Sequence, residues 1–330
     1  MNDKIVDIII PAYNAHKTIV DNILSICYQS FADKVKITIV NDASDRDYSD
    51  IVNKFKKLID IKQLNMKTNE GPGFARQYGL DNTDAPYVMF MDSDDVLANP
   101  YAIEDLLMSM DVDTDIVISS FVKEDLKYSC VEYNSVVWLH GKLFRRSFIE
   151  DNGIRFITSR VNEDTAFNQL CILKKANIKY IDNTTYIWKY NENSITTKND
   201  KEYNYKCVIG FAEAMASTLD MCYMTDCNID WFKQLSCDIL LSVYYDYLYH
   251  YSKYAIEDKK KIFDSCKRIH KYKKKFQYDD EYIDNRFKDY FEIYSNKYNS
   301  SYILNPKFTF KEFINMVEGD IYDWYNNSGV

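Results

Sequence analysis

Three carboxylates lie within four consecutive residues in the run Asp92-Ser93-Asp94-Asp95, directly after the apolar stretch 88–91. Carboxylates this close repel one another unless a cation lies among them, and their hard oxygens suit Mg²⁺ or Mn²⁺. Substrate phosphates commonly complete the shell of such an ion. The same run also fits a turn before a helix N-cap, where aspartate accepts hydrogen bonds from free backbone amides. Taken alone, the run supports both interpretations.

The elements that must position this run alternate between strand-like and helix-like stretches from residue 5 to residue 121. Such alternation predicts an α/β fold with an open, mostly parallel sheet flanked by helices. Successive apolar residues in three of the strands are typical of strands that helices cover on both faces. The predicted strands are 5–10, 35–40, 61–66, 87–91 and 115–121, and the predicted helices lie near 16–29, 48–60, 73–82 and 100–109.

Polar residues follow these three apolar strands at the point where each one ends. They are Tyr13-Asn14, Asn41-Asp42 and the acidic run at 92–95. In open α/β sheets, ligands bind at the carboxyl ends of the strands. We therefore expect the three polar clusters to meet in one cleft.

Five motifs follow one another along the chain. They are Ile8-Ile9-Ile10-Pro11-Ala12-Tyr13-Asn14, Val40-Asn41-Asp42-Ala43-Ser44, Asn69-Glu70-Gly71-Pro72-Gly73-Phe74-Ala75-Arg76, Phe90-Met91-Asp92-Ser93-Asp94-Asp95 and Asn162-Glu163-Asp164. With these motifs in this order, the chain resembles the family-2 glycosyltransferases of the GT-A fold over about residues 5 to 197. The resemblance implies a Rossmann-like catalytic domain that binds a nucleotide sugar and Mn²⁺ or Mg²⁺.

By this resemblance, Pro11, Tyr13 and Asp42 line the nucleobase pocket of the donor site, and Asn14 also binds the donor. The Tyr13 ring would lie against the base, and Asp42 would accept a hydrogen bond from a uracil-like imide. An acceptor carboxylate selects such a donor, because a base without the imide N–H would leave it unsatisfied. The family usually has two acidic residues where this chain has Asn41-Asp42, and Asp42 could instead form an Asx-turn with Ser44.

The resemblance assigns the donor phosphates and the metal to a second group of residues. Asp94 and Asp92 would be the metal ligands, with Asp92 serving the ribose or the metal and Ser93 facing the donor. Arg76 would grip phosphate oxygens, as guanidinium groups do in pairs of hydrogen bonds, although an arginine on a helix is often solvated. Lys189 would contact the diphosphate from a closing loop that includes Ser194-Ile195-Thr196.

The pair Glu163-Asp164 matches the acidic pair that supplies the catalytic base in this family. Asp164 would remove the acceptor proton in an inverting displacement, opposite the leaving diphosphate. A helix N-cap is the structural alternative for this pair. Trp138, His140 and Gly141 would border the acceptor side, although buried Trp and His are more often core residues.

The C-terminal part differs in composition from the first 200 residues. Residues 1–200 are predicted to form the catalytic domain, with a donor half at about 1–95 and an acceptor half at about 96–200. Residues 201–330 are rich in tyrosine at helical spacing, which predicts a mainly α-helical domain whose rings pack together and which binds the acceptor or a partner.

The run 259–276 holds nine Lys or Arg residues against one acid, Asp264. A solvated helix face is the default interpretation of such a run. Contact with anionic lipid head groups or with nucleic-acid phosphates is the functional alternative. The net charge of −9 argues against a general nucleic-acid binder.

Cysteine spacing and hydropathy exclude several other classes. The eight cysteines form no Cys-x-x-Cys pair and the chain has four histidines, so a zinc site or a disulfide framework is not expected. No apolar run reaches the ~18 residues of a membrane span, and the first residues do not resemble a signal peptide. We therefore expect a cytoplasmic protein without an integral membrane segment.

The sequence thus predicts a metal-dependent glycosyltransferase that favours a UDP-sugar donor. A glycan or lipid-linked saccharide is the preferred acceptor, and a nucleic-acid base or a protein remains open. A nucleotidyltransferase would usually carry a glycine-rich basic loop after the first strand, where this chain has Pro11-Ala12-Tyr13-Asn14. A non-catalytic module that binds nucleotide sugars or glycans is the third alternative.

Overall fold

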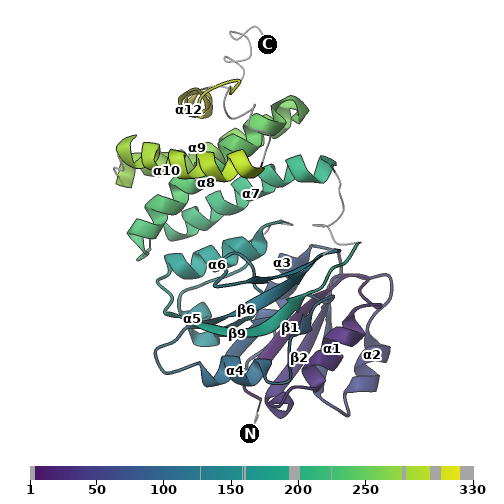
Figure 1. The fold of residues 1–330 in the computed structure, drawn as a ribbon. Coiled ribbons are helices and arrows are strands. Elements are labelled where there is room, and N and C mark those ends of the chain that lie inside the picture. The colour runs from purple at the N-terminus through teal and green to yellow at the C-terminus, as the bar shows by residue number, and fades with distance from the viewer. Residues whose placement is uncertain are drawn as a thin grey trace. The chain divides into compact units, whose positions relative to one another are not determined.

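The computed structural model describes residues 4–126, 128–157, 159, 161–192, 201–223, 225–276, 280–297 and 306–319. The chain divides into two compact units, Met1–Lys198 and Asn199–Val330. The first is an α/β unit and the second is helical (Figure 1).

Four parallel strands form the first half of the α/β sheet, in the order β3-β2-β1-β4. In β1, β2 and β4 the central positions are buried on successive residues and mostly apolar, so helices must cover both faces of these strands. The predicted strands and helices of this half are all present. Their bounds are β1 (Val6–Ala12), α1 (Ile19–Cys27), a 3₁₀ turn (Ala32–Lys34), β2 (Val35–Asn41), α2 (Ser49–Phe55), β3 (Asp60–Asn65), α3 (Pro72–Asp81) and β4 (Tyr87–Phe90).

The second half makes the sheet mixed, with the order continuing β4-β8-β6-β9-β5 and β7 paired to β6. Only the β6–β9 pairing is parallel here; β4–β8, β6–β8, β6–β7 and β5–β9 are antiparallel. The α/β class with flanking helices is confirmed, and the parallel character belongs to the first half. The elements are β5 (Val96–Leu97), α4 (Ala102–Met108), β6 (Ile116–Glu124), β7 (Ser129–Glu132), β8 (Lys142–Arg145), α5 (Arg146–Asp151), α6 (Glu163–Leu173) and β9 (Ile178–Trp188).

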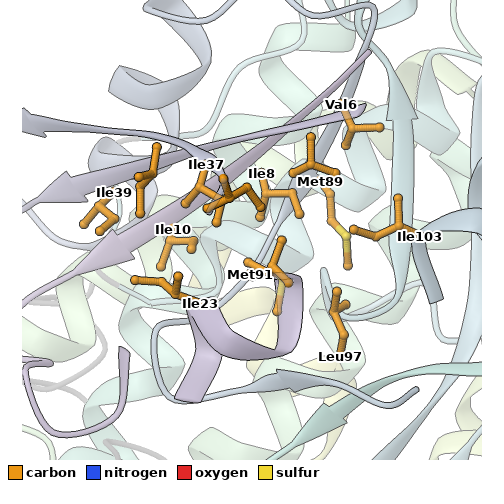
Figure 2. Packing of buried hydrophobic residues seen from close by; sticks show 14 of the residues in the cluster. Val6, Ile8, Ile10, Ile23, Ile37, Ile39, Met89, Met91, Leu97 and Ile103 are labelled. Atoms are coloured by element: carbon orange, nitrogen blue, oxygen red, sulfur yellow. The ribbon is translucent and has the colours of Figure 1, made fainter. Parts of the chain in front are cut away.

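One face of the parallel half packs the main apolar core (Figure 2). Side chains alternate across a strand, so Val6, Ile8 and Ile10 of β1 all point to this face, where Ile23 of α1 meets them. Burying a side chain of this size is worth about 1.5–3 kcal/mol. The core therefore fixes β1, and with it the polar residues that follow β1.

Helix α3 packs closely against the other face of β1, because Gly79 has no side chain there. A Cβ on Gly79 would overlap the Cγ2 of Ile9 and lie 3.0 Å from the Cγ2 of Val40. Glycine lets the helix backbone approach the sheet this closely. The approach positions Arg76, one turn earlier on α3, at the carboxyl end of the sheet.

The second unit contains helices that pair at a constant sequence offset. Asp238 and Arg286 lie 48 residues apart, as do Asp246 and Tyr294, so α8 and α10 run parallel. The same offset joins Asp220 of α7 to Arg268 of α9. The helices are α7 (Lys201–Cys222), α8 (Ile229–His250), a 3₁₀ turn (Tyr251–Lys253), α9 (Ile256–Phe276), α10 (Asp280–Lys297) and α12 (Phe310–Glu318).

Tyrosines of this unit pack in its interior, as the composition predicts. Tyr244 and Tyr247 are buried, and their rings lie 5.6 and 5.8 Å from the ring of Phe313 on α12. The mainly helical character of the C-terminal region is therefore confirmed over the described residues.

Several basic side chains of α9 contact other residues of the helical unit. Lys259 is buried with its ammonium 3.9 Å from the Tyr251 ring centroid, and Arg268 and Lys271 both bond to Asp220. Contact of the run with lipid or nucleic acid stays a prediction.

All eight cysteines are free thiols. Within the described ranges, no helix has the length and apolar character that crossing a membrane requires.

Candidate active site

The acidic run forms a turn directly after β4. The backbone N–H of Asp95 donates to the Asp92 carbonyl over 3.2 Å, and the Asn22 amide of α1 donates to the carbonyls of Asp92 and Asp95 at 2.9 and 2.8 Å. The next element is strand β5, and α4 begins only at residue 102. The run is therefore a turn at the end of a strand, and the helix-cap interpretation of Asp95 is wrong.

Asp92 lies between two basic side chains. Its Oδ1 is 2.5 Å from Nη2 of Arg76, and its Oδ2 is 3.6 Å from Nε2 of His140. Burial disfavours the charged carboxylate, yet Arg76 and His140 together hold the pKa of Asp92 well below its usual range. Asp92 is therefore ionised.

Asp94 and Asp95 carry more negative charge than their surroundings neutralise. Asp95 is buried and accepts hydrogen bonds from the Tyr186 hydroxyl at 2.6 Å and the Lys189 backbone N–H at 2.9 Å, while Asp94 accepts one from the Asn191 amide at 2.8 Å. Burial and then the neighbouring Asp92 raise the pKa of both carboxyls. A bound cation would relieve this repulsion.

His140, Asp92 and Asp95 together offer a set of metal ligands that could hold that cation. Its Nε2 lies 3.6 Å from Asp92 Oδ2 and 3.8 Å from Asp95 Oδ2, and the donor atoms of the three residues lie within 4.8 Å of one another. Burial lowers the pKa of His140, which keeps the imidazole neutral as a metal ligand requires. The set differs from the predicted pair in holding Asp95 and His140, and Asp94 faces Asn191 instead.

Arg76 joins the acidic turn to the predicted catalytic pair. Its guanidinium is buried, with Nη2 on Asp92 and Nη1 2.7 Å from Glu163 Oε1. Gly73 gives Glu163 room, since a Cβ at that position would lie 2.9 Å from the Glu163 Cγ. Arg76 and Glu163 thus form an internal ion pair between α3 and α6, and in this conformation both guanidinium ends bind carboxylates.

Asp164 occupies the first turn of α6 and is half-buried. Asn162 is the N-cap residue, and the Asp164 Oδ1 accepts the Thr165 backbone N–H at 2.7 Å. Burial and then the adjacent Glu163 raise the pKa of Asp164 to about 6. A carboxylate that titrates near neutrality is suited to accept a proton as a general base.

The predicted nucleobase residues lie at the ends of β1 and β2. Pro11 is buried within β1, whereas the Tyr13 ring is 54% exposed. The Asn14 amide and Asp45 exchange two hydrogen bonds at 3.0 and 3.2 Å. Tyr13 therefore offers an open ring face at this end of the sheet.

Asp42 is buried, and its two oxygens accept the backbone N–H groups of Glu70 and Gly71 at 2.8 and 2.9 Å. The turn with Ser44 belongs to Asn41, whose Oδ1 accepts the Ser44 N–H at 2.9 Å. The Asx-turn alternative for Asp42 is therefore wrong. Asp42 holds the loop that leads into α3.

Aromatic rings line the other side of the acidic turn. Trp138 is half-buried and stacks on His140 at 6.1 Å, and Trp188 lies 5.0 Å from both rings. Gly141 adopts a φ of +64°, and a Cβ there would lie 2.5 Å from the Ser119 Oγ. The sequence analysis did not name Trp188 as a site residue. Trp188 lies two residues after Tyr186 on the same strand, so the two side chains share one face of the sheet, and this spacing could have indicated its position.

Lys189 reaches the turn through its backbone. Its N–H bonds to Asp95, while its ammonium lies 3.0 Å from Glu124 of β6. The predicted loop at 194–196 lies outside the described residues.

Known proteins similar to this chain include several glycosyltransferases. A model of the glycosyl transferase family 2 matches residues 7–162. An uncharacterized glycosyltransferase of Haemophilus influenzae is 25% identical over 252 residues, which cover 76% of this chain and 97% of that protein. The poly(ribitol-phosphate) beta-N-acetylglucosaminyltransferase TarS of Staphylococcus aureus is 25% identical over 55% of this chain, which spans 35% of TarS.

Solved structures show the same fold. Residues 1–349 of S. aureus TarS in complex with UDP-GlcNAc match with a TM-score of 0.62 at 18% identity, over 80% of each chain. The mannosyltransferase PcManGT of Pyrobaculum calidifontis, in complex with GDP-Man and Mn²⁺, matches with a TM-score of 0.53 at 13% identity, over 88% and 86% of the two chains.

The α/β unit has the GT-A fold. Residues 7–162 match glycosyltransferase family 2, and the chain is a glycosyltransferase.

Proposed function

We propose that the protein transfers a sugar from a UDP-sugar to a hydroxyl group of a glycan, with inversion and with a divalent cation. The observation that carries this proposal is a pair of ion pairs, Asp92–Arg76 at 2.5 Å and Arg76–Glu163 at 2.7 Å. They join the acidic turn, whose carboxylates could bind a cation, to helix α6, which carries Asp164. Arg76 thus fixes the candidate metal site relative to the candidate base. Such fixed positions suit a reaction in which an acceptor hydroxyl displaces the diphosphate from the sugar.

The donor assignment rests on the base end of the sheet and on TarS, whose structures hold UDP and UDP-GlcNAc. Carboxylate oxygens have more than one lone pair, so Asp42 can accept an imide N–H in addition to its backbone bonds. The exposed Tyr13 ring offers a stacking face for the base. UDP-GlcNAc is therefore the first donor to test.

The chemistry of the donor set fits Mn²⁺ better than Mg²⁺. Asp92 and Asp95 supply hard oxygens, and the neutral imidazole of His140 favours a transition metal. Bound there, the cation would neutralise the charge that develops on the departing diphosphate. Asp94 would join the donor set if its carboxylate turned away from Asn191.

Asp164 would take the proton from the acceptor hydroxyl as that oxygen attacks the anomeric carbon. The C–O bond to the diphosphate breaks as the new C–O bond forms, and the proton leaves on the Asp164 carboxylate. Arg76 would hold Asp92 and Glu163, and through Glu163 the first turn of α6, in the orientation that this step requires.

The acceptor assignment rests on the half-buried rings of Trp138 and Trp188 beside the turn. Aromatic faces suit the apolar face of a sugar ring. A lipid-linked saccharide presents the same chemistry. The cytoplasmic location and the acceptor- or partner-binding role of residues 201–330 stay predictions.

Incubation with UDP-GlcNAc, MnCl₂ and a panel of p-nitrophenyl glycosides tests this function. We expect UDP release and a glycoside product in the wild type, no turnover in Asp164→Asn, and retained UDP-GlcNAc binding in that variant by calorimetry. Asp94→Ala tests whether that carboxylate is needed for metal-dependent turnover.

Other outcomes assign other functions. Release of pyrophosphate in a separate incubation with UTP and a sugar 1-phosphate would indicate a nucleotidyltransferase, and binding of UDP-GlcNAc without turnover would indicate a non-catalytic module. Unchanged transfer by Asp164→Asn would disprove its role as the base. A thermal shift with other nucleotide sugars but none with UDP-sugars would disprove the uridine assignment.

A further inference from the structure

The backbone that carries Trp138 lies between β7 and β8 and is held from the protein interior by two side chains. The Asn168 amide donates to the Val137 carbonyl at 2.8 Å, and the Lys142 ammonium donates to the Trp138 carbonyl. Asn168 is 3% exposed and Lys142 is 1% exposed. Two consecutive carbonyls of a loop thus bond to buried donors.

A lysine in this position is energetically costly. A buried ammonium loses its hydration, and this loss costs free energy unless the protein supplies partners for the charge. Apolar side chains of similar length would fill the space beside β8 without that desolvation cost. The hydrogen bond to Trp138 is therefore what the buried ammonium adds.

The partner residues share one face of α6. Asp164, Asn168 and Cys171 are spaced at i, i+4 and i+7, which places them in one row along the helix. The Asn168 amide also donates to the Asp164 carbonyl at 3.0 Å. The same amide therefore joins the turn that carries Asp164 to the loop that carries Trp138.

We propose that Lys142 and Asn168 are positioning residues that fix the Trp138 loop to helix α6, so that the Trp138 ring and the Asp164 carboxylate keep a set separation across a bound acceptor sugar. The inference rests on the proposed function, because it takes Trp138 as the acceptor wall and Asp164 as the base. Neither Lys142 nor Asn168 would touch the donor or the acceptor.

Two variants and a matched control test the proposal. Lys142→Met and Asn168→Leu each remove donors to the loop at nearly constant volume and add no buried charge. Lys259→Met, in α9, removes another buried ammonium far from this loop in sequence and controls for the general effect of such a change. Circular dichroism and thermal melting establish that each variant is folded.

The first measurement compares transfer with hydrolysis. We expect both site variants to lower kcat/KM for a p-nitrophenyl glycoside relative to UDP-GlcNAc hydrolysis by up to about a hundredfold, since a misplacement of ~1 Å can cost that much. Lys259→Met keeps the wild-type ratio. A purely structural role would lower both activities together and leave the ratio unchanged, which would overturn the proposal.

The second measurement follows the loop itself. In a protein that keeps only Trp138, with the other three tryptophans replaced by Phe, acrylamide should quench the fluorescence more strongly in both site variants than in the parent and the Lys259→Met control. Unchanged quenching in both variants would refute the positioning role. This arm decides the inference even if the wild type turns over neither UDP-GlcNAc nor a glycoside, an outcome that would refute the proposed function.

Discussion

His140 is the residue whose role changes most between sequence and structure. Its segment predicts a place on the acceptor side, with a structural role as the alternative, whereas its Nε2 lies within 4 Å of two carboxylates of the acidic turn. The sequence could not show this, because β8 and the loop before it reach β4 only through sheet pairing. The helix cap that the sequence offered as the alternative for the acidic run is likewise absent, because strand β5 follows the run.

We expect His140→Ala to weaken Mn²⁺ binding at least about tenfold, because changes at a metal site commonly cost ten- to a hundredfold in affinity. Calorimetric titration with MnCl₂ measures this. His250→Ala, which removes a buried histidine of the helical unit, should bind Mn²⁺ like the wild type. Wild-type affinity in His140→Ala would mean that Asp94 completes the metal site instead.

Asp164 sets the expected pH dependence. Its pKa of about 6 predicts that kcat/KM rises with pH through this value, because a base must be ionised to accept a proton. The raised pKa also means that the folded protein loses stability as pH rises from the ordinary value of 3.8 to about 6. Asp164→Asn should lack this loss and should melt no lower than the wild type at pH 7.

A pH series of melting temperatures and initial rates checks both statements. A rate that does not change between pH 5 and about pH 7 in the wild type would contradict the assignment of Asp164 as a base that titrates in this range.

At the scale of elements, the first half of the sheet follows from its apolar strands. The sequence predicts β1, β2, β3, β4 and β6 within a few residues of their bounds, and all of these except β3 combine an apolar run with clear breaks. It does not predict β8, which begins at the buried Lys142 and is a strand only through its pairing with β4 and β6. Pairing between distant segments leaves no local pattern in the sequence.

Gly79 offers a test of how closely α3 must approach the sheet. We expect Gly79→Ala to lower the free energy of unfolding by about 1–3 kcal/mol, because its Cβ would overlap Ile9 and overpack the core. Urea denaturation measures the change. Gly319→Ala, whose Cβ would meet only the Asn315 carbonyl at 3.2 Å, should change stability by less than about 0.5 kcal/mol.

Arg76 should also move with α3, so Gly79→Ala should reduce UDP-GlcNAc turnover more than it reduces the amount of folded protein. Equal stability of the wild type and Gly79→Ala would show that the helix shifts without strain.

At the scale of the whole molecule, the chain combines an α/β unit that carries the site with a helical unit. The sequence predicted that this second unit is helical, but it held no motif that predicts which helices pair. In this unit, Arg286 of α10 donates two hydrogen bonds to the Asp238 carboxylate of α8, at 2.7 and 2.6 Å. The side chains of Asp238 and Arg286 are 15% and 25% exposed. These residues lie 48 positions apart, so their pairing could not be deduced from helical periodicity alone.

A double-mutant cycle of Asp238→Ala and Arg286→Ala should give a coupling energy of about 1 kcal/mol, above that of exposed pairs because both side chains are mostly buried. Lys34 and Asp33, which are 42% and 70% exposed, supply the comparison pair with a coupling near zero. A coupling near zero for Asp238 and Arg286 would mean that the aromatic contacts alone hold α10.

Helix α10 runs parallel to α8, and α9 packs against α7, so the hairpin α9–α10 stacks on the hairpin α7–α8. Arrays of this kind are quasi-one-dimensional, since each hairpin touches only its neighbours and stability adds up unit by unit. Removal of α9 and α10 should therefore expose the faces of α7 and α8 that they cover and lower the stability of the helices that remain.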